Sequence, residues 1–189
     1  KMAPPRSREL VVLLPARFRL AGDRGRATRT STGTGAEAKA ILAGEGVCGI
    51  DLFAGPSEIA VIADNNADPM TVAIDLLSQG EHGTNSPVWL FTESRELCDK
   101  VMELMPKLIA DMPDPATPAQ SWKDYGEIIL CDSPEEVVKV SDQYAPEHLE
   151  LLVNEPFVVL NRIDNAGEIL LGAMTPIPTA NYALGLNAI

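Results

Sequence analysis

Short apolar runs separated by helix-like segments constrain the fold of this chain more than any other feature. Within each run, apolar residues follow one another and do not alternate with polar residues. A strand with one face in water alternates, whereas a strand of a parallel sheet is covered on both faces and does not. We therefore predict an α/β fold, a Rossmann-like sandwich with a mostly parallel sheet and right-handed crossovers. The clearest strands lie at residues 58–63, 87–92, 127–131 and 169–171, and further short apolar runs lie at 151–153 and 157–160.

The helices are predicted from their start signals, which are capping side chains and prolines at the first helical position. Asp68 caps a helix that has Pro69 at its first position and runs to about His82, and Ser133 caps another. By the same rule, Pro146 is expected to open a short helix. Further helices are expected at residues 36–42 and 94–109, and a proline-rich loop at residues 112–118.

Charge divides the chain near residue 35. The whole chain of 189 residues has a formal net charge of −12, but its first 35 residues carry +6 and the remaining 154 carry −18. We interpret residues 1–35 as a basic leader, either a disordered basic tail or transit-like segment, or sequence that is not native. Residues 36–189 have the composition of a globular domain.

Composition excludes several classes of protein. Strong acidity argues against a nucleic-acid partner, and no apolar run approaches the roughly 20 residues that cross a bilayer. The three cysteines, Cys48, Cys98 and Cys131, are widely spaced and form no CxxC metal motif. Reduced thiols in a cytoplasmic protein are therefore expected.

The two histidines of the chain each follow a glutamate, and the first pair is Glu81-His82. Asp75, Gln79 and His82 share one polar face of the predicted helix, apart from its apolar face. Gln79 and His82 can reach one cation together, although zinc normally takes at least three protein ligands. The alternative is a solvent-facing polar stripe whose last histidine complements the helix dipole.

The second pair, Glu147-His148, follows Pro146. A helix that begins at Pro146 places both residues in its first turn, where free backbone N–H groups favour an ionised carboxylate. Such a glutamate can orient a water molecule or the adjacent imidazole. The alternative is a helix start in which Glu147 only complements the dipole. Ser57, in the tight loop before the first strand, carries little weight alone.

Taken together, GIDLFAGPSEIAVIADNNADP, DLLSQGEHG and SDQYAPEHLEL resemble, in this order and spacing, the histidinol dehydrogenase family. The resemblance extends from about residue 36 to the end and implies a zinc- and NAD-dependent enzyme that works as a homodimer. It implies that Gln79 and His82 bind zinc and contact substrate, and that Ser57 and His148 also contact substrate. Glu147 and His148 are implied as the catalytic acid and base.

The reaction implied is oxidation of an amino alcohol through an aldehyde to a carboxylate, which belongs to L-histidine biosynthesis if the substrate is histidinol. Asn181 stands where the family has an aspartate zinc ligand, and Ala188 replaces a histidine that contacts the substrate. These two positions resemble relatives that oxidise other alcohols, such as sulfopropanediol dehydrogenases. By this resemblance, Asn181 would bind metal and substrate.

Family members are more than twice as long as this chain. The resemblance therefore implies that residues 36–189 are a partial catalytic domain, and we expect little or no activity from this fragment alone. An alternative from a different class is a non-catalytic α/β module, or pseudoenzyme, that binds a protein partner. The catalytic reading requires the site residues to converge at the carboxyl ends of the strands.

Overall fold

A computed structural model describes residues 11–13 and 57–179 of the chain. The predictions for residues 36–42, Cys48, Asn181 and Ala188 lie outside these ranges. The described strands are β1 Val11–Leu13, β2 Ile59–Ala63, β3 Val88–Thr92, β4 Gly126–Leu130, β5 His148–Leu152 and β6 Glu168–Leu171. The helices are α2 Pro69–Gly80, α3 Arg95–Ala110, α4 Ala116–Tyr125, α5 Pro134–Tyr144, α6 Pro156–Leu160 and α7 Ile177–Thr179.

The strands form one sheet in the order β1-β4-β3-β2-β5-β6, in which the five strands β2 to β6 run parallel to one another. The chain starts this parallel set in the middle at β2, builds outward through β3 and β4, then crosses back to β5 and β6, as in a Rossmann fold. The prediction of a mostly parallel α/β sheet is confirmed. β1, which lies inside the predicted basic leader, pairs antiparallel with the edge of β4.

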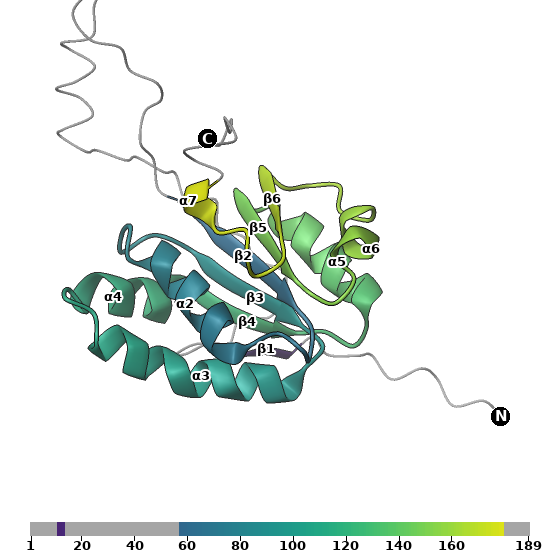
Figure 1. The fold of residues 1–189 in the computed structure, drawn as a ribbon. Coiled ribbons are helices and arrows are strands. Elements are labelled where there is room, and N and C mark those ends of the chain that lie inside the picture. The colour runs from purple at the N-terminus through teal and green to yellow at the C-terminus, as the bar shows by residue number, and fades with distance from the viewer. Residues whose placement is uncertain (1–10, 14–56, 180–189) are drawn as a thin grey trace, which may run out of the picture.

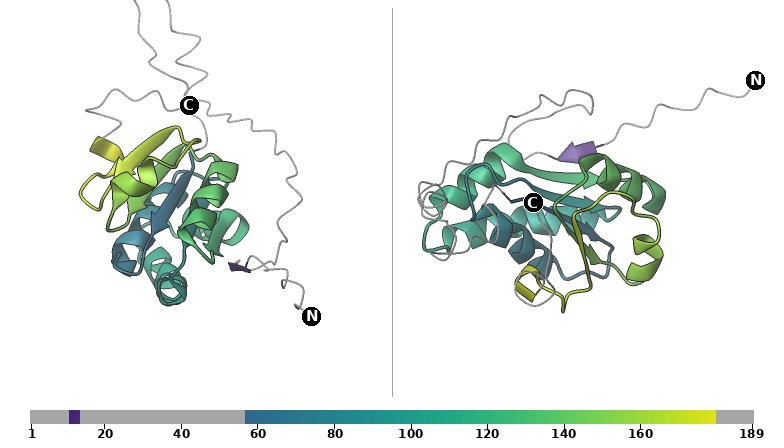
Figure 2. Two further views of the ribbon diagram at one scale, coloured as in Figure 1. Left: turned by 90° about the vertical axis from the view of Figure 1, so that its right-hand side faces the viewer. Right: turned by 90° about the horizontal axis from the view of Figure 1, so that it is seen from above.

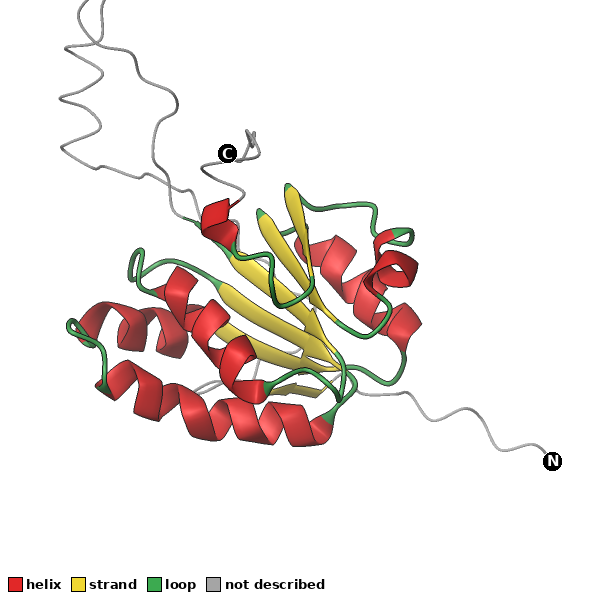
Figure 3. Ribbon diagram, in the orientation of Figure 1, coloured by secondary structure: helices red, strands yellow, loops and turns green. Residues whose placement is uncertain are grey.

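Helices cover both faces of the sheet, as Figure 1 and the turned views of Figure 2 show. Along β2, Ile59, Val61 and Ala63 pack with α2 and α3, whereas Ala60 and Ile62 pack on the side of α5 and α6. All five residues of β2 are buried, which explains why the strand is apolar throughout. Figure 3 shows the strands as one layer between the helices.

Most predicted helix starts are confirmed, but the proline-rich loop is shorter than expected. The side chain of Asp68 accepts from the backbone N–H groups at the start of α2, and Ser94 and Ser133 cap α3 and α5 in the same way. Helix α4 begins at Ala116, inside the predicted loop. Pro118 fits in its first turn because the backbone N–H groups there have no acceptor within the helix.

The helix predicted to start at Pro146 does not exist. Instead, α5 ends at Tyr144, Ala145 takes a left-handed conformation with φ 48°, and β5 begins at His148. Proline is common just after a helix end as well as at a helix start, and Pro146 follows the end of α5. The apolar run at residues 157–160 forms part of helix α6.

Two further expectations concern cysteines and membranes. Cys98 and Cys131 are free and buried, and burial raises the pKa of their thiols to about 11 and about 12. They are therefore packing residues with little thiolate at neutral pH. Within the described ranges, none of the helices has the length and apolarity needed to cross a bilayer.

Candidate functional site

The second Glu-His pair lies at the amino ends of the parallel strands, on the sheet face that α2 and α3 cover. His148 is the first residue of β5 and pairs with Ile59 of β2 and with Glu168, the first residue of β6. The expectation that the site lies at the carboxyl ends is wrong for this pair, because strands in parallel register bring their first residues together. The opposite end has a cavity of about 310 Å³, lined by residues that include Asp64, Asp68 and Asn154, but no histidine.

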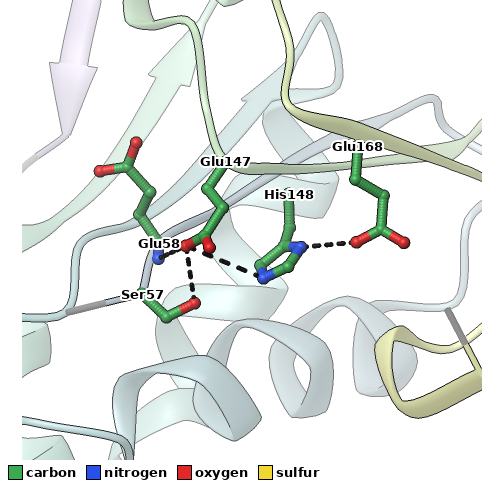
Figure 4. Close-up of polar contacts among 5 residues, drawn as sticks. All are labelled: Ser57, Glu58, Glu147, His148 and Glu168. Carbon is green, nitrogen blue, oxygen red and sulfur yellow. Dashed lines mark hydrogen bonds and ion pairs between the residues drawn. The ribbon is translucent and has the colours of Figure 1, made fainter. Parts of the chain in front are cut away.

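Glu147 is held by the residues that lead into β2. Its Oε2 accepts a hydrogen bond of 2.9 Å from the Ser57 hydroxyl and one of 3.3 Å from the backbone N–H of Glu58 (Figure 4). Its side chain is 15% exposed, so it retains some access to solvent. Hydrogen bonds from N–H and O–H groups stabilise a carboxylate in its ionised form. The donors to Glu147 thus come from the start of β2, and not from the helix N-terminus that was expected.

His148 lies between two carboxyl groups, as Figure 4 shows. Its Nε2 is 3.8 Å from Glu147 Oε2, and its Nδ1 is 2.6 Å from Glu168 Oε2. The side chains of His148 and Glu168 are only 4% and 3% exposed. One ring nitrogen therefore contacts a buried partner, while the other faces Glu147, which is partly exposed.

Glu168 was not among the predicted site residues. Its signal in the sequence is weak, a single charged residue directly before the apolar run of β6. Only the pairing of β6 with β5 shows that it meets His148, which is 20 residues earlier in the chain.

Gly167 allows β6 to approach β5 at this point. A Cβ atom on Gly167 would lie 2.8 Å from the backbone oxygen of Glu147 and 3.3 Å from its Cα. The backbone N–H of Glu168 donates to that same oxygen at 2.8 Å. The close approach places the side chain of Glu168 directly beside His148.

The same sheet face carries a second buried carboxyl, Glu150, two residues along β5. Burial, and then the charge of Asp75 on α2, raise the pKa of Glu150 to about 8. Burial likewise raises the pKa of Asp75, while its hydrogen bond with Glu150 lowers it. Glu150 is therefore mostly protonated at neutral pH and can donate to the Asp75 carboxylate.

The sequence matches the family model described as histidinol dehydrogenase over residues 33–189, which include all of these site residues. The chain belongs to the histidinol dehydrogenase family. It is 51% identical over 156 residues to a histidinol dehydrogenase homolog of Pelagibacter ubique, covering 82% of this chain and 36% of that protein. It is also 44% identical over 154 residues to sulfopropanediol 3-dehydrogenase of Ruegeria pomeroyi, covering 80% of this chain and 35% of that one.

A solved structure gives the same family. The crystal structure of histidinol dehydrogenase from Elizabethkingia anophelis matches with a TM-score of 0.67 and 35% identity, over 75% of this chain and 33% of that chain. The chain thus spans about a third of the length of the relatives it matches.

The first Glu-His pair has a different environment from the second. Because α2 returns between two parallel strands, its C-terminal end lies at the amino ends of the strands, where Gly80 approaches Val88 of β3. Gln79 is only 2% exposed, so the interpretation of a wholly solvent-facing stripe is wrong for it. His82 is exposed, as that interpretation expects.

The described residues do not by themselves make the zinc site expected of a histidinol dehydrogenase. No group of three histidine, cysteine or acidic side chains within the described ranges is arranged to hold a metal ion. Gln79 and His82 are two neutral donors, fewer than zinc normally requires, and Asn181 lies outside the described residues. The assignment of Gln79, His82 and Asn181 as zinc ligands therefore stays a prediction.

Proposed function

We propose that the complete protein is an NAD-dependent dehydrogenase that oxidises an alcohol through an aldehyde to a carboxylate, with Glu147 and His148 as its acid and base. The observation that carries this proposal is the line of contacts from Ser57 through Glu147 and His148 to Glu168. It presents a carboxylate and an imidazole nitrogen together at one end of the sheet. Family membership supports the reaction class.

In the first oxidation, His148 Nε2 would accept the proton of the substrate hydroxyl as the alcohol becomes an aldehyde. An imidazole suits this task because its proton affinity lies near neutral pH. NAD, when bound, would supply the hydride acceptor for each of the two oxidations.

In the second oxidation, Glu147 accepts a proton from a water molecule that attacks the aldehyde carbon. Oxidation of the hydrated aldehyde would then give the carboxylate product. The partial exposure of Glu147 admits water, and the donors at Ser57 and Glu58 keep its carboxylate oriented.

Zinc and NAD are proposed as cofactors of the complete enzyme, with Gln79, His82 and Asn181 as metal ligands. Zinc, when bound, would polarise the hydroxyl of the substrate. The amide of Asn181 and the methyl of Ala188 favour a substrate other than histidinol. The sulfopropanediol 3-dehydrogenase among the relatives makes a small polar diol a suitable first candidate.

A chimera tests this function, because the chain spans only a third of its relatives. Residues 36–189 would replace the matching segment of the Ruegeria pomeroyi sulfopropanediol 3-dehydrogenase, and NADH formation would be measured with sulfopropanediol and with histidinol. We expect activity, and we expect Glu147→Gln and His148→Ala each to lower kcat by about 10²- to 10⁴-fold. Glu81→Gln, in the exposed Glu-His pair, is the matched control and should leave kcat unchanged.

A folded chimera that oxidises neither alcohol would contradict the proposal and favour the non-catalytic module. Equal activity of the His148→Ala variant and the parent chimera would remove His148 from the mechanism.

A further inference from the structure

Glu168 is fixed beside His148 by the backbone as well as by its side chain. The two residues are direct cross-strand partners in the parallel pairing of β5 with β6. The backbone N–H of Gly167 donates to Pro146 at 2.9 Å, and that of Glu168 donates to Glu147 at 2.8 Å. The contact of 2.6 Å between Glu168 Oε2 and His148 Nδ1 therefore arises from the sheet itself.

Among the described residues, His148 is the hydrogen-bond partner of the buried Glu168 carboxyl. Glu168 Oε2 contacts His148, and Glu168 Oε1 is buried with no hydrogen-bond partner among the described residues. A buried carboxylate without a donor is strongly disfavoured. The pair is therefore most stable when Nδ1 of the imidazole carries a proton and donates it to Glu168.

The position of that proton decides what the other nitrogen can do. A neutral imidazole has one N–H and one lone pair, so a proton on Nδ1 leaves the lone pair on Nε2. Nε2 is the nitrogen that faces Glu147, at 3.8 Å. A proton on Nε2 instead would leave the ring unable to accept one at that position.

We propose that Glu168 is a positioning residue that holds neutral His148 as the Nδ1–H tautomer, with Nε2 free to accept a proton beside Glu147. The proposal rests on the proposed function for the identity of the base, but the tautomer itself is a property of the chain alone. A carboxylate at Nδ1 also stabilises the imidazolium that forms when Nε2 takes a proton.

The chain is suited to a direct measurement because it holds two histidines, one buried and one exposed. Long-range ¹H–¹⁵N NMR spectra of the full chain labelled with ¹⁵N-histidine report the tautomer of each neutral imidazole. His82→Asn assigns the two sets of signals. We expect His148 almost wholly as Nδ1–H, and His82 as a mixture in which Nε2–H, the form favoured by free imidazole in water, predominates.

Variants separate the positioning role from general packing. Glu168→Leu removes the acceptor and is expected to shift His148 toward the tautomer mixture of His82. Glu150→Gln changes an equally buried carboxyl on the same sheet face and is expected to leave the tautomer of His148 unchanged.

Wild-type His148 found as Nε2–H, or as a mixture like that of His82, would overturn the proposal without any variant. A Glu168→Leu protein that keeps His148 as Nδ1–H would also overturn it. These outcomes are distinct from a failure of the proposed function, since a fixed Nδ1–H tautomer in an inactive folded chimera would reject the function alone.

Discussion

The same dipeptide, Glu-His, occurs twice in this chain, in opposite environments. Glu81-His82 follows the end of α2 and is exposed. Glu147-His148 leads into β5, where the histidine is buried and the glutamate is 15% exposed. Local sequence alone does not distinguish the two pairs, so their difference comes from the elements packed around them.

The hydrogen bonds described for the two pairs show what burial adds. Those of the first pair join backbone groups, from Glu81 to Leu77 and from His82 to Gln79. In the second pair both side chains are held, Glu147 by Ser57 and Glu58, and His148 by Glu168. An exposed side chain samples many rotamers, whereas the buried pair is held in one arrangement, as the proposed acid and base require.

Replacing each histidine is expected to give the largest difference in stability between the two pairs. His148→Ala leaves the buried Glu168 carboxyl without its donor, so the free energy of unfolding should fall by about 3 kcal/mol. His82→Ala changes an exposed side chain and should cost less than about 0.5 kcal/mol. Urea unfolding of the two variants measures both values. Equal losses would mean that the environment of His148 contributes nothing to stability.

Substitution of the glycine beside each pair is expected to give a smaller difference in stability. Gly167→Ala forces a Cβ against the backbone oxygen of Glu147, at 2.8 Å, and backbone cannot move without separating β6 from β5. We expect a loss of about 2 kcal/mol in urea unfolding. Gly83→Ala is the matched control, because its Cβ would lie 3.1 Å from the side-chain oxygen of the exposed Asn85, which can turn away. If Gly83→Ala were the more harmful change, the close approach at Gly167 would not be the constraint on β6.

The fold was predictable from sequence where a local signal has one meaning. Asp68-Pro69 and Ser133-Pro134 marked helix starts correctly, because a capping side chain precedes the proline in both cases. Pro146 lacks such a cap and follows a helix end instead. The left-handed conformation of Ala145 shows that Pro146 follows a helix end and does not start a helix. An alanine gives no sequence signal for this conformation.

The site was predictable in residue type but not in arrangement. Glu147 and His148 stood out as a pair, while the donors to Glu147 come from Ser57 and Glu58, about 90 residues earlier in the chain. Glu168 meets His148 only through strand register, and Gln79 is buried only because the end of α2 packs against the sheet. Pairing and packing of distant elements are set by the whole fold, so no local pattern reveals them.

A pH-dependent effect is predicted for the Glu150 carboxyl near the buried pair, and it has a definite sign. Burial raises the pKa of Glu150 to about 8 in the folded chain, above the value near 4.3 of an unfolded glutamate. Between these two values the folded state binds more protons than the unfolded state. Stability therefore falls as pH rises through this window, by at most about 1.4 kcal/mol for each pH unit.

Glu150→Gln removes this dependence, because glutamine resembles the protonated acid and keeps a donor for Asp75. Relative to wild type, the variant should gain stability steadily between about pH 5 and pH 8. Urea unfolding at several pH values measures the gain, with the exposed Glu81→Gln as the control that should change by less than about 0.5 kcal/mol throughout. A Glu150→Gln protein whose stability relative to wild type is the same at pH 5 and pH 8 would show that Glu150 is ionised in the fold. Glu150 would then carry a negative charge beside the Asp75 carboxylate, on the sheet face that holds His148.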